Sequence, residues 1–286
     1  MTILEVIQRS ADYLAKHGVD SPRLQAELLL AHVLRVPRMG LYLEFQRVLA
    51  EPELAAAREL VKRRGQREPL QHLVGSVSFC GFELAVNPHV LVPRPETEPL
   101  AEAAWSFLSA SGQQTPLALD LCTGSGCLAI ALAMKCPRAM IHAADLSPEA
   151  LTIARANAER HGASARMIFH EGDLFTPLPA ELKFDLIVSN PPYIPTGEIT
   201  ALEPEVRDHD PRAALDGGED GLDFYRRIAT EGADRLRSGG RLMAEFGDGQ
   251  AEALRRIFTL SGWQVREILP DLDGRPRILI ASGAGS

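Results

Sequence analysis

The sequence predicts an α/β fold: a mostly parallel seven-stranded sheet covered by helices, preceded by a small helical domain and a β-hairpin connector. Three observations support this prediction. From residue 117 onward, apolar segments of strand length alternate with segments of helical periodicity, a pattern typical of parallel sheets covered on both faces. The first 70 or so residues carry helical periodicity only. A short stretch with strand periodicity and turn residues lies between these two regions.

The chain therefore divides into three parts. Residues 1–75 are expected to form a helical substrate-recognition domain, residues 76–96 a β-hairpin connector, and residues 97–286 the sheet domain. Within the helical part, the Ser21-Pro22 pair predicts a helix start, with Ser21 as the N-cap and Pro22 at the first helical position.

The alternation predicts seven strands and four principal helices in the sheet domain. The strands are expected at 117–121, 139–144, 166–170, 184–189, 240–246, 263–268 and 276–282. The helices are expected at 126–135, 147–161, 221–237 and 249–260. Ligands of such sheets bind at the carboxyl ends of the strands, so the residues that follow each strand are the candidates for a functional site.

Composition and charge exclude several classes of function. The formal net charge is −8, and the residues after position 85 hold 19 basic and 28 acidic side chains. Such a region lacks the basic face with which proteins bind nucleic acid. The cysteines and histidines show no paired or metal-ligand spacing, so neither disulfides nor a metal site are expected. No signal-peptide core or membrane-spanning run is visible, which predicts a soluble, cytoplasmic protein without a membrane partner.

A glycine-containing loop follows the first strand of the sheet domain and leads directly into a helix. The segment reads Asp120-Leu121-Cys122-Thr123-Gly124-Ser125-Gly126. Its glycines let the backbone turn sharply and approach a ligand closely. The loop alone leaves three interpretations open, because the spacing of Gly124, Gly126 and Ala129 also fits a dinucleotide fingerprint, and a glycine turn can serve packing alone.

Acidic residues at three strand ends favour S-adenosylmethionine over a dinucleotide. Asp120 precedes the loop and suits a cationic cofactor better than a pyrophosphate. Asp145 ends the next strand, where a carboxylate can accept both hydroxyls of a ribose. Asp173, after the third strand, can receive the exocyclic amine of an adenine, and Leu174 offers an apolar contact to the ring.

The fourth strand ends in the tetrapeptide Asn190-Pro191-Pro192-Tyr193. Two consecutive prolines remove two backbone donors, so the carbonyl groups there remain as acceptors. The side-chain oxygen of Asn190 and the Pro191 carbonyl could take the two N–H hydrogens of a primary amide and orient its nitrogen toward a methyl donor. The Tyr193 ring would help to stabilise positive charge growing on that nitrogen. The tetrapeptide thus predicts methylation of a planar amide or amine nitrogen, with an ordinary strand-ending turn as the alternative.

These motifs resemble the protein-(glutamine-N5) methyltransferases that act on class 1 peptide chain release factors. The resemblance covers nearly the whole chain, including DSPRLQAELLLAHVL, VLVPRPETE, DLCTGSGCLAIALA, SNPPYIPTGEI, LEPEVRDHDPRAALDGGEDGLDFYRRI and DLDGRPRILI. It implies a class I, Rossmann-like S-adenosylmethionine-dependent methyltransferase domain behind a helical domain. It also implies that the substrate is the glutamine of the Gly-Gly-Gln motif in a release factor, with no direct role for nucleic acid.

The resemblance also implies a set of site residues. By position, the cofactor is expected to contact Cys122, Thr123, Gly124, Ser125, Gly126, Asp145, Asp173, Leu174 and Asn190. The substrate glutamine and the catalytic step are expected to involve Asn190, Pro191, Pro192 and Tyr193, with Leu91, Arg94 and Glu96 close to the pocket. Many members carry Gly where this chain has Cys122, and backbone contacts there make a large effect unexpected.

Several related functions remain as alternatives. A sister branch methylates a glutamine of a large-subunit ribosomal protein, but PRPETE and the compact N-terminal region favour the release-factor branch. Methyltransferases of exocyclic base amines share the tetrapeptide, but they must extrude the base and usually carry a basic recognition region, which this acidic chain lacks. A nicotinamide-dependent dehydrogenase has no use for the tetrapeptide, and a non-catalytic cofactor-binding protein has no need of the intact acceptor positions.

Overall fold

The structure is a computed structural model that describes residues 1–271 and 273–283. Its contacts divide the chain into two compact units. The helical unit comprises Met1–Ser76 together with Leu202–His209, and the sheet unit comprises Val77–Ala201 together with Asp210–Ser286. The chain therefore leaves the helical unit after residue 76, returns to it once at 202–209, and then completes the sheet unit.

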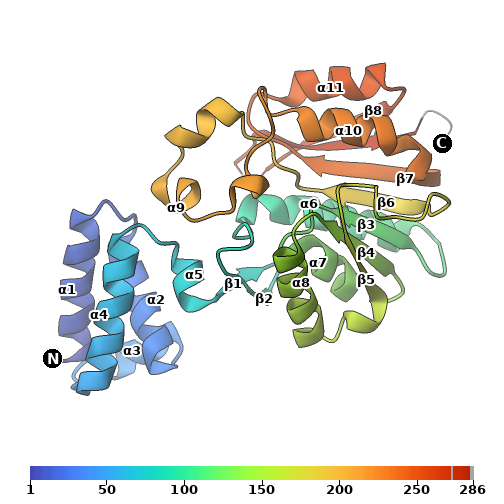
Figure 1. Cartoon of the computed structure of the whole chain (residues 1–286). Helices are drawn as coiled ribbons and strands as arrows, with labels where there is room; N and C mark the ends of the chain where they lie inside the picture. The colour runs from blue at the N-terminus through green and yellow to red at the C-terminus, as the bar shows by residue number, and fades with distance from the viewer. Residues whose placement is uncertain (272, 284–286) are drawn as a thin grey trace. The chain divides into compact units, whose positions relative to one another are not determined.

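The helical unit contains helices from the N-terminal region and one short helix from much later in the chain (Figure 1). These are α1 (Ile3–Lys16), α2 (Pro22–Leu34), α3 (Arg38–Leu43), α4 (Glu51–Gly65), α5 (Leu70–Val74) and α9 (Pro204–Arg207). Apolar faces of α1, α2 and α4 meet in two buried clusters, in which Ile7 and Leu30 belong to one and Leu14 and Leu29 to the other.

The start of α2 differs in detail from the prediction. The helix begins at Pro22, as expected, but the side chain of Ser21 makes no capping hydrogen bond. Ser21 has a φ of 46°, in the left-handed region. Ser21 therefore occupies the N-cap position, as predicted, but a capping side chain reaches the first helical N–H groups from an extended backbone, so its hydroxyl does not cap the helix.

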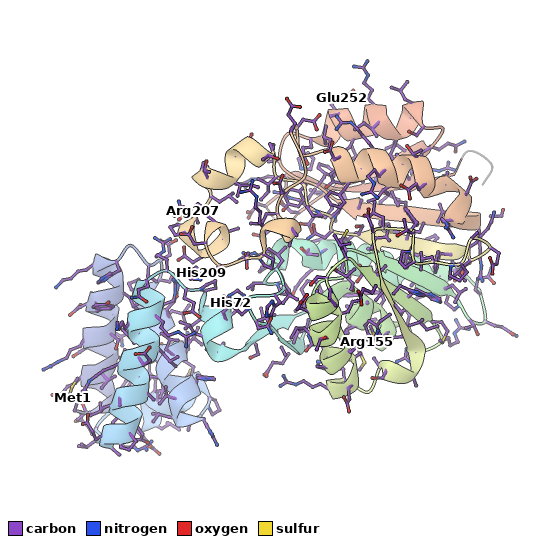
Figure 2. All side chains as sticks on the ribbon, in the orientation of Figure 1. Met1, His72, Arg155, Arg207, His209 and Glu252 are labelled. Atoms are coloured by element: carbon purple, nitrogen blue, oxygen red, sulfur yellow. The ribbon has the colours of Figure 1, made fainter. Side chains whose placement is uncertain are left out.

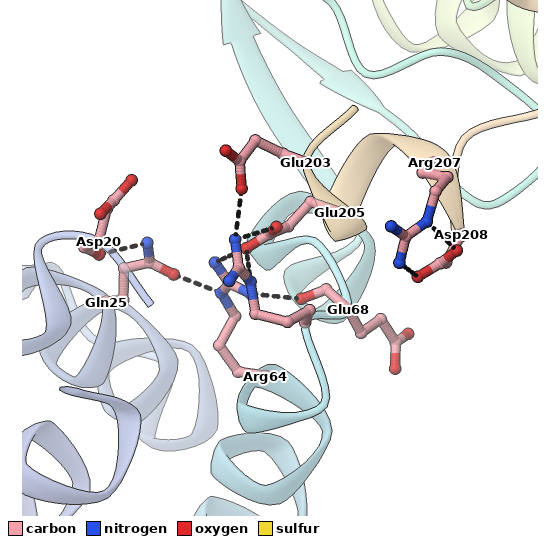
Figure 3. A network of polar contacts seen from close by, with 9 residues as sticks. Asp20, Gln25, Arg64, Glu68, Glu203, Glu205, Arg207 and Asp208 are labelled. Atoms are coloured by element: carbon pink, nitrogen blue, oxygen red, sulfur yellow. Dashed lines mark hydrogen bonds and ion pairs between the residues drawn. The ribbon is translucent and has the colours of Figure 1, made fainter. Parts of the chain in front are cut away.

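Ion pairs hold the segment 202–209 within the helical unit (Figure 3). The Glu205 carboxylate accepts hydrogen bonds from Arg64 Nη2 at 2.7 Å and from Arg67 Nε at 2.6 Å. Arg67 Nη2 also donates to Glu203 at 3.0 Å. Arg64 is only 4% exposed, and its Nε donates to Gln25 of α2. A buried guanidinium needs such partners, because a charge without one is costly in the protein interior.

The sheet unit opens with the two-stranded sheet of β1 (Ser76–Phe79) and β2 (Phe82–Ala85). The two residues that join these strands, Cys80 and Gly81, have φ values of 51° and 82°. Two successive positive φ angles are the geometry of the two-residue turns that connect hairpin strands. The predicted β-hairpin connector is therefore present.

The main sheet contains seven strands in the order β5-β4-β3-β6-β7-β9-β8. They are β3 (Leu117–Leu121), β4 (Met140–Asp145), β5 (Met167–Glu171), β6 (Phe184–Ser189), β7 (Leu236–Glu245), β8 (Gln264–Pro270) and β9 (Pro276–Ser282). All pairs are parallel except the two that involve β9. The predicted fold class is confirmed. Strand order reverses between β3 and β6, and ligands of open α/β sheets bind at such a reversal.

Helices cover both faces of this sheet (Figure 1). The helices are α6 (Glu98–Ala110), α7 (Cys127–Lys135), α8 (Pro148–Arg160), α10 (Asp223–Glu231) and α11 (Ala251–Leu260). Leu186 and Val188 of β6 lie in the core shared with α6, α7 and α8, whereas Ile187 lies in the core shared with α10 and α11. Alternate residues of a strand point to opposite faces, so a central strand is buried on both sides, and its polar residues Asp185 and Ser189 are hydrogen-bonded.

One helix is shorter and one strand longer than predicted. The helix expected at 221–237 ends at Glu231, and the strand expected at 240–246 already begins at Leu236. Leu236 pairs with Phe184 of β6, and Arg237 Nη1 donates to the buried Asp185 carboxylate at 2.8 Å. These long-range contacts draw the segment into the sheet, although its local pattern favours a helix.

Candidate active site

A cavity of about 410 Å³ lies at the carboxyl ends of β3, β4 and β6, within the sheet unit. Of the residues predicted from the sequence, those that line it are Leu91, Cys122, Gly124, Asp145, Asp173, Leu174, Asn190 and Pro192. The predicted residues that do not line it are Thr123, Ser125, Gly126, Pro191, Tyr193, Arg94 and Glu96. The ends of several strands therefore converge on one cavity.

The loop after β3 is held in shape by a buried carboxylate. Asp120 Oδ2 accepts hydrogen bonds from Thr123 Oγ1 at 2.6 Å and from the Ala129 N–H at 3.1 Å. Burial raises the pKa of Asp120 to about 7. Thr123 and Ser125 are themselves 4% and 2% exposed, so they act in the conformation of the loop instead of lining the cavity.

Close packing explains the second glycine of the loop. Gly126 has a φ of 81°, and a Cβ there would come within 3.1 Å of Ala154 on α8. Asn157, also on α8 and fully buried, donates from Nδ2 to the carbonyls of Ser125 and Ala85, each at 3.0 Å. Its Oδ1 accepts from the Ala85 N–H at 2.7 Å. Asn157 thus joins the connector to the cofactor loop, a role that the sequence pattern did not indicate.

Asp145, at the end of β4, faces the cavity with both oxygens hydrogen-bonded to backbone. Oδ2 accepts from the Gly124 N–H at 2.8 Å, and Oδ1 accepts from the Ser147 N–H at 2.9 Å. Burial raises the pKa of Asp145, and these backbone hydrogen bonds oppose that shift. A carboxylate oxygen has two lone pairs, so each oxygen keeps one for the hydroxyl group of a ligand.

Asp173 lines the cavity together with a cation from α10. Arg227 Nη2 donates to Asp173 Oδ2 at 2.8 Å. Leu174, at 4% exposed, adds an apolar surface, and Phe224 adds an aromatic one. Phe224 and Arg227 were not predicted as site residues, although both belong to the segment LDGGEDGLDFYRR, which resembles the family.

The tetrapeptide leaves the end of β6 beside the cavity. Ser189, the last residue of the strand, donates from Oγ to the Leu121 carbonyl at 2.8 Å and so ties β6 to β3. Asn190 and Pro192 line the cavity, and Asn190 Nδ2 donates to Thr97 Oγ1 at 3.3 Å. Pro191 and Pro192 are both buried.

Tyr193 turns to the opposite side of the loop. Its carbonyl accepts from Gln250 Nε2 at 2.9 Å, and a Cβ added at Gly247 would come within 3.0 Å of its ring. Burial raises the pKa of the Tyr193 hydroxyl to about 12, so the side chain is neutral at physiological pH.

Of the three connector residues expected close to the pocket, only Leu91 lines the cavity. Leu91 lines the cavity, together with the neighbouring Pro88, His89 and Val90. Arg94 Nη2 instead donates to Asp210 Oδ2 at 2.9 Å, and Glu96 is exposed. Arg94 therefore links the connector to the segment that follows α9 in the chain.

The cavity suits a methyl donor that carries a nucleoside and a positive charge. It combines acidic strand ends with apolar surface, the surroundings expected for a ribose, a flat base and a sulfonium. Across residues 1–271 and 273–283, no group of three or more His, Cys, Asp and Glu side chains is arranged to hold a metal ion. Over the same ranges, no helix is long and apolar enough to cross a membrane.

The fold and this site define a class I S-adenosylmethionine-dependent methyltransferase. A methyltransferase from Pyrococcus furiosus has the same fold, with 22% identity, a TM-score of 0.52, and coverage of 71% of this chain and 90% of that chain. The hMettl16 catalytic domain, solved in complex with the MAT2A 3'UTR hairpin 6, is also similar, with 14% identity, a TM-score of 0.57, and coverage of 82% and 83%. At these identities the likeness concerns the fold alone.

Sequence comparison identifies the family. Residues 5–75 match the PrmC N-terminal domain, and residues 105–203 match the methyltransferase small domain. The release factor glutamine methyltransferase of Geobacter sulfurreducens is 48% identical over 262 residues, which cover 92% of this chain and 90% of that protein. The one of Deinococcus radiodurans is 41% identical over 285 residues, covering 100% of both chains. The chain belongs to the release factor glutamine methyltransferase family.

Proposed function

We propose that this enzyme transfers a methyl group from S-adenosylmethionine to the side-chain amide nitrogen (N5) of the glutamine in the Gly-Gly-Gln motif of class 1 peptide chain release factors. The observation that carries this proposal is the position of Asn190 and Pro192, which end β6 at a cavity also lined by Asp145 and Asp173. Relatives that match nearly the whole chain are named for this reaction. They do not favour a ribosomal-protein glutamine or a nucleobase as the substrate.

Residues of the cavity hold the donor. When bound, S-adenosylmethionine supplies an electrophilic methyl group on a cationic sulfur. The free lone pairs of Asp145 suit the ribose hydroxyls, and Leu174 with Phe224 suits the adenine ring. Asp173 shares its carboxylate with Arg227, so one of its oxygens remains for the adenine amine. Cys122 and Gly124 bring loop backbone to the cavity wall.

The tetrapeptide orients the substrate amide. An amide nitrogen is a poor nucleophile, because its lone pair is delocalised into the carbonyl group. Asn190 Oδ1 and the Pro191 carbonyl are acceptors for the two N–H hydrogens, so they fix the plane of the amide. Positive charge grows on the nitrogen as the methyl group is transferred, and these acceptors stabilise it more than they stabilise the ground state. The methylated nitrogen then loses a proton to water.

The helical unit provides surface for the release factor. Its α3 region exposes large apolar side chains, with Leu43 88%, Val48 69% and Met39 65% exposed. Exposed apolar groups of this kind often mark protein interaction sites. A single glutamine offers too little area for specific recognition, since stable protein interfaces bury at least about 1,200 Å². A release-factor substrate also supports a cytoplasmic location for the enzyme, and the acidic sheet domain supports a protein substrate over a nucleic acid.

The test is methylation of a purified release factor with isotopically labelled S-adenosylmethionine. We expect the label on the Gly-Gly-Gln glutamine, located by peptide mass spectrometry, and its loss when that glutamine is replaced by Asn or Ala. An isolated Gly-Gly-Gln peptide should be a much poorer substrate than the folded factor. Label on adenine or only on a ribosomal-protein glutamine would contradict the proposal, as would calorimetry that shows tight binding of NADH and none of S-adenosylmethionine.

A further inference from the structure

Glu245, which the sequence analysis did not select, is a buried carboxylate next to the tetrapeptide. It is the last residue of β7 and is 2% exposed. In the parallel register of β6 and β7, Ser189 is the partner of Ala244, so Glu245, the last residue of β7, lies at the level of Asn190, the residue after β6. Its backbone carbonyl accepts from the Tyr225 hydroxyl at 2.6 Å. These contacts place Glu245 beside Asn190, in the interior of the sheet unit.

Few hydrogen bonds and positive charges offset the cost of burying the Glu245 carboxyl group. Its Oε2 is buried and has no hydrogen-bond partner in the part of the chain that the structure describes. Burial raises the pKa of Glu245 to about 7, while the side chains of Thr97 and Asn190, as hydrogen-bonding neighbours, and the cation of Arg277 oppose that shift. Glu96 is the other nearby carboxylate and raises the pKa further. A polar group buried in this way is unfavourable for stability, so a role in the site explains it better than packing.

Thr97 is a neighbour of both groups: its side chain and that of Asn190 are the hydrogen-bonding groups that lower the pKa of Glu245, and Thr97 itself contacts Asn190. Thr97 precedes α6, is 2% exposed, and its Oγ1 accepts from Asn190 Nδ2 at 3.3 Å. A hydroxyl group has one hydrogen, and an ionised carboxylate can only accept. When Glu245 is ionised, the Thr97 hydroxyl must donate to it, and a Thr97 lone pair is then left for the Asn190 amide group.

This order of donors determines which end of the Asn190 amide faces the substrate. An asparagine amide can rotate to exchange its oxygen and nitrogen with little steric change. With Nδ2 directed to Thr97, Oδ1 is the atom left for the cavity that Asn190 lines. The reversed amide would present two N–H groups to a substrate nitrogen that also carries N–H groups, and no hydrogen bond could form.

We propose that Glu245 is a positioning residue which, through Thr97, holds the side-chain amide of Asn190 with its oxygen toward the substrate nitrogen. The inference rests on the proposed function, because it assumes that Asn190 Oδ1 accepts a hydrogen bond from the glutamine amide. It adds two residues, Glu245 and Thr97, that touch neither substrate nor donor and act on the orientation of one that does.

The test compares Glu245→Gln and Thr97→Val with Thr97→Ser and with Glu252→Gln. Glu252 lies on the exposed side of α11 and serves as the matched control (Figure 2). We expect kcat to fall about 10- to 100-fold in Glu245→Gln and Thr97→Val, because the preorganised acceptor is lost in a fraction of molecules. KM for the release factor and Kd for S-adenosylmethionine should stay within about twofold. Thr97→Ser keeps the hydroxyl and should retain most of the activity.

The pH dependence of kcat distinguishes a role of Glu245 in orienting Asn190 from a role in the stability of the fold alone. In the wild type, kcat should fall as pH drops below about 7, because a protonated Glu245 can donate to Thr97 and the order of donors is no longer fixed. In Glu245→Gln this acidic limb should be absent. Wild-type kcat in both Glu245→Gln and Thr97→Val would overturn the inference, and so would a loss of donor binding equal to the loss of kcat. Asn190→Ala is measured in parallel: if it keeps full activity, the proposed role of Asn190 fails, whereas an inactive Asn190→Ala beside active Glu245 and Thr97 variants removes only the positioning role.

Discussion

Gly124 donates its backbone N–H to the Asp145 carboxylate across the ends of β3 and β4, at 2.8 Å. The bond joins two segments that are 21 positions apart in the sequence and that line the same cavity. Gly124 has a φ of 55°, a conformation that side chains disfavour. The carboxylate therefore has two roles: it stabilises a loop conformation that glycine adopts readily, and it presents its remaining lone pairs to a ligand.

Asp145→Asn should weaken donor binding strongly. An asparagine amide group can replace only one of the two oxygens as an acceptor, so either the Gly124 or the Ser147 N–H loses its partner. The substitution also removes the charged acceptor proposed for the ribose hydroxyls, and a hydrogen bond to a charged group contributes about 1.5–3 kcal/mol, which corresponds to an increase of roughly 10- to 100-fold in Kd for S-adenosylmethionine. Calorimetric titration measures it, with Glu252→Gln as the control. An unchanged Kd in a folded Asp145→Asn variant would exclude this role of Asp145.

Glu205→Ala should destabilise the helical unit, whereas Glu203→Ala should not. Removing Glu205 leaves Arg64, 4% exposed, without its main counter-charge, and breaking a buried pair costs about 3 kcal/mol. The Glu203 side chain is 78% exposed, so its pair with Arg67 contributes at most about 1 kcal/mol. Hydrogen exchange of residues 202–209 and of α4 reports both changes. Equal protection in the two variants would show that the burial of Arg64 does not depend on Glu205.

The ion pairs of Glu205 with Arg64 and Arg67 also predict that the stability of the helical unit falls at acidic pH. Burial opposes ionisation of Glu205, but hydrogen bonds from Arg67 and Arg64 outweigh it and lower its pKa. The stabilisation is therefore complete above the pKa of the unfolded chain, about 4.3, and is lost as pH falls through the lower pKa of the folded state. Acid titration of wild type and Glu205→Gln, followed by hydrogen exchange at 202–209, should show this loss in the wild type alone.

Asp120 predicts that the stability of the sheet unit falls as the pH rises, which is the opposite direction. Burial raises its pKa to about 7 in the folded protein, against about 3.9 when unfolded. The contribution of Asp120 to stability is thus present below about pH 4 and is lost as pH rises to about 7. Asp120→Asn cannot ionise, so its stability relative to the wild type should rise between these pH values. Denaturant unfolding of the sheet unit without cofactor tests this, and a constant difference from pH 4 to 8 would refute it.

Substitutions on the exposed apolar surface of α3 should affect only the protein substrate. Leu43→Glu and Met39→Glu replace side chains that are 88% and 65% exposed, so the fold should tolerate them. If the release factor covers this surface, KM for the factor should rise about tenfold, while Kd for S-adenosylmethionine stays constant. Leu260→Glu, at a position 77% exposed on α11, is the matched control. An unchanged KM in both α3 variants would place the substrate surface elsewhere.

The periodicity of the sequence was sufficient to predict that the sheet forms and that a cavity lies at the carboxyl ends of its strands. The strand at 184–189 was predicted from its mostly apolar sequence, and the structure shows that all of its residues are buried. Parallel strands end at one edge, so Asp145, Asp173 and Asn190 could be expected to meet there, and all three line the cavity.

Contacts between distant segments were not predictable in the same way. The partner of Arg94 is Asp210, 116 positions later, and no local pattern indicates that pair. The same holds for Arg64 with Glu205 and for Glu245 beside Asn190. Periodicity also does not tell which side of a helix meets a ligand, so Phe224 and Arg227 on α10 were missed.

The return of the chain at 202–209 changes what a single cut could do. Suppose that a protease cleaved the chain between Ser76 and Val77. Residues 1–76 would then have no covalent bond to the rest of the protein, but Arg64 and Arg67 would still form ion pairs with Glu205 of the other fragment. The helical unit therefore cannot be exchanged between relatives by joining two sequences at a single position. A chimaera must exchange residues 1–76 and 202–209 together, because a foreign helical region without Arg64 and Arg67 would leave the Glu205 carboxylate without these two partners.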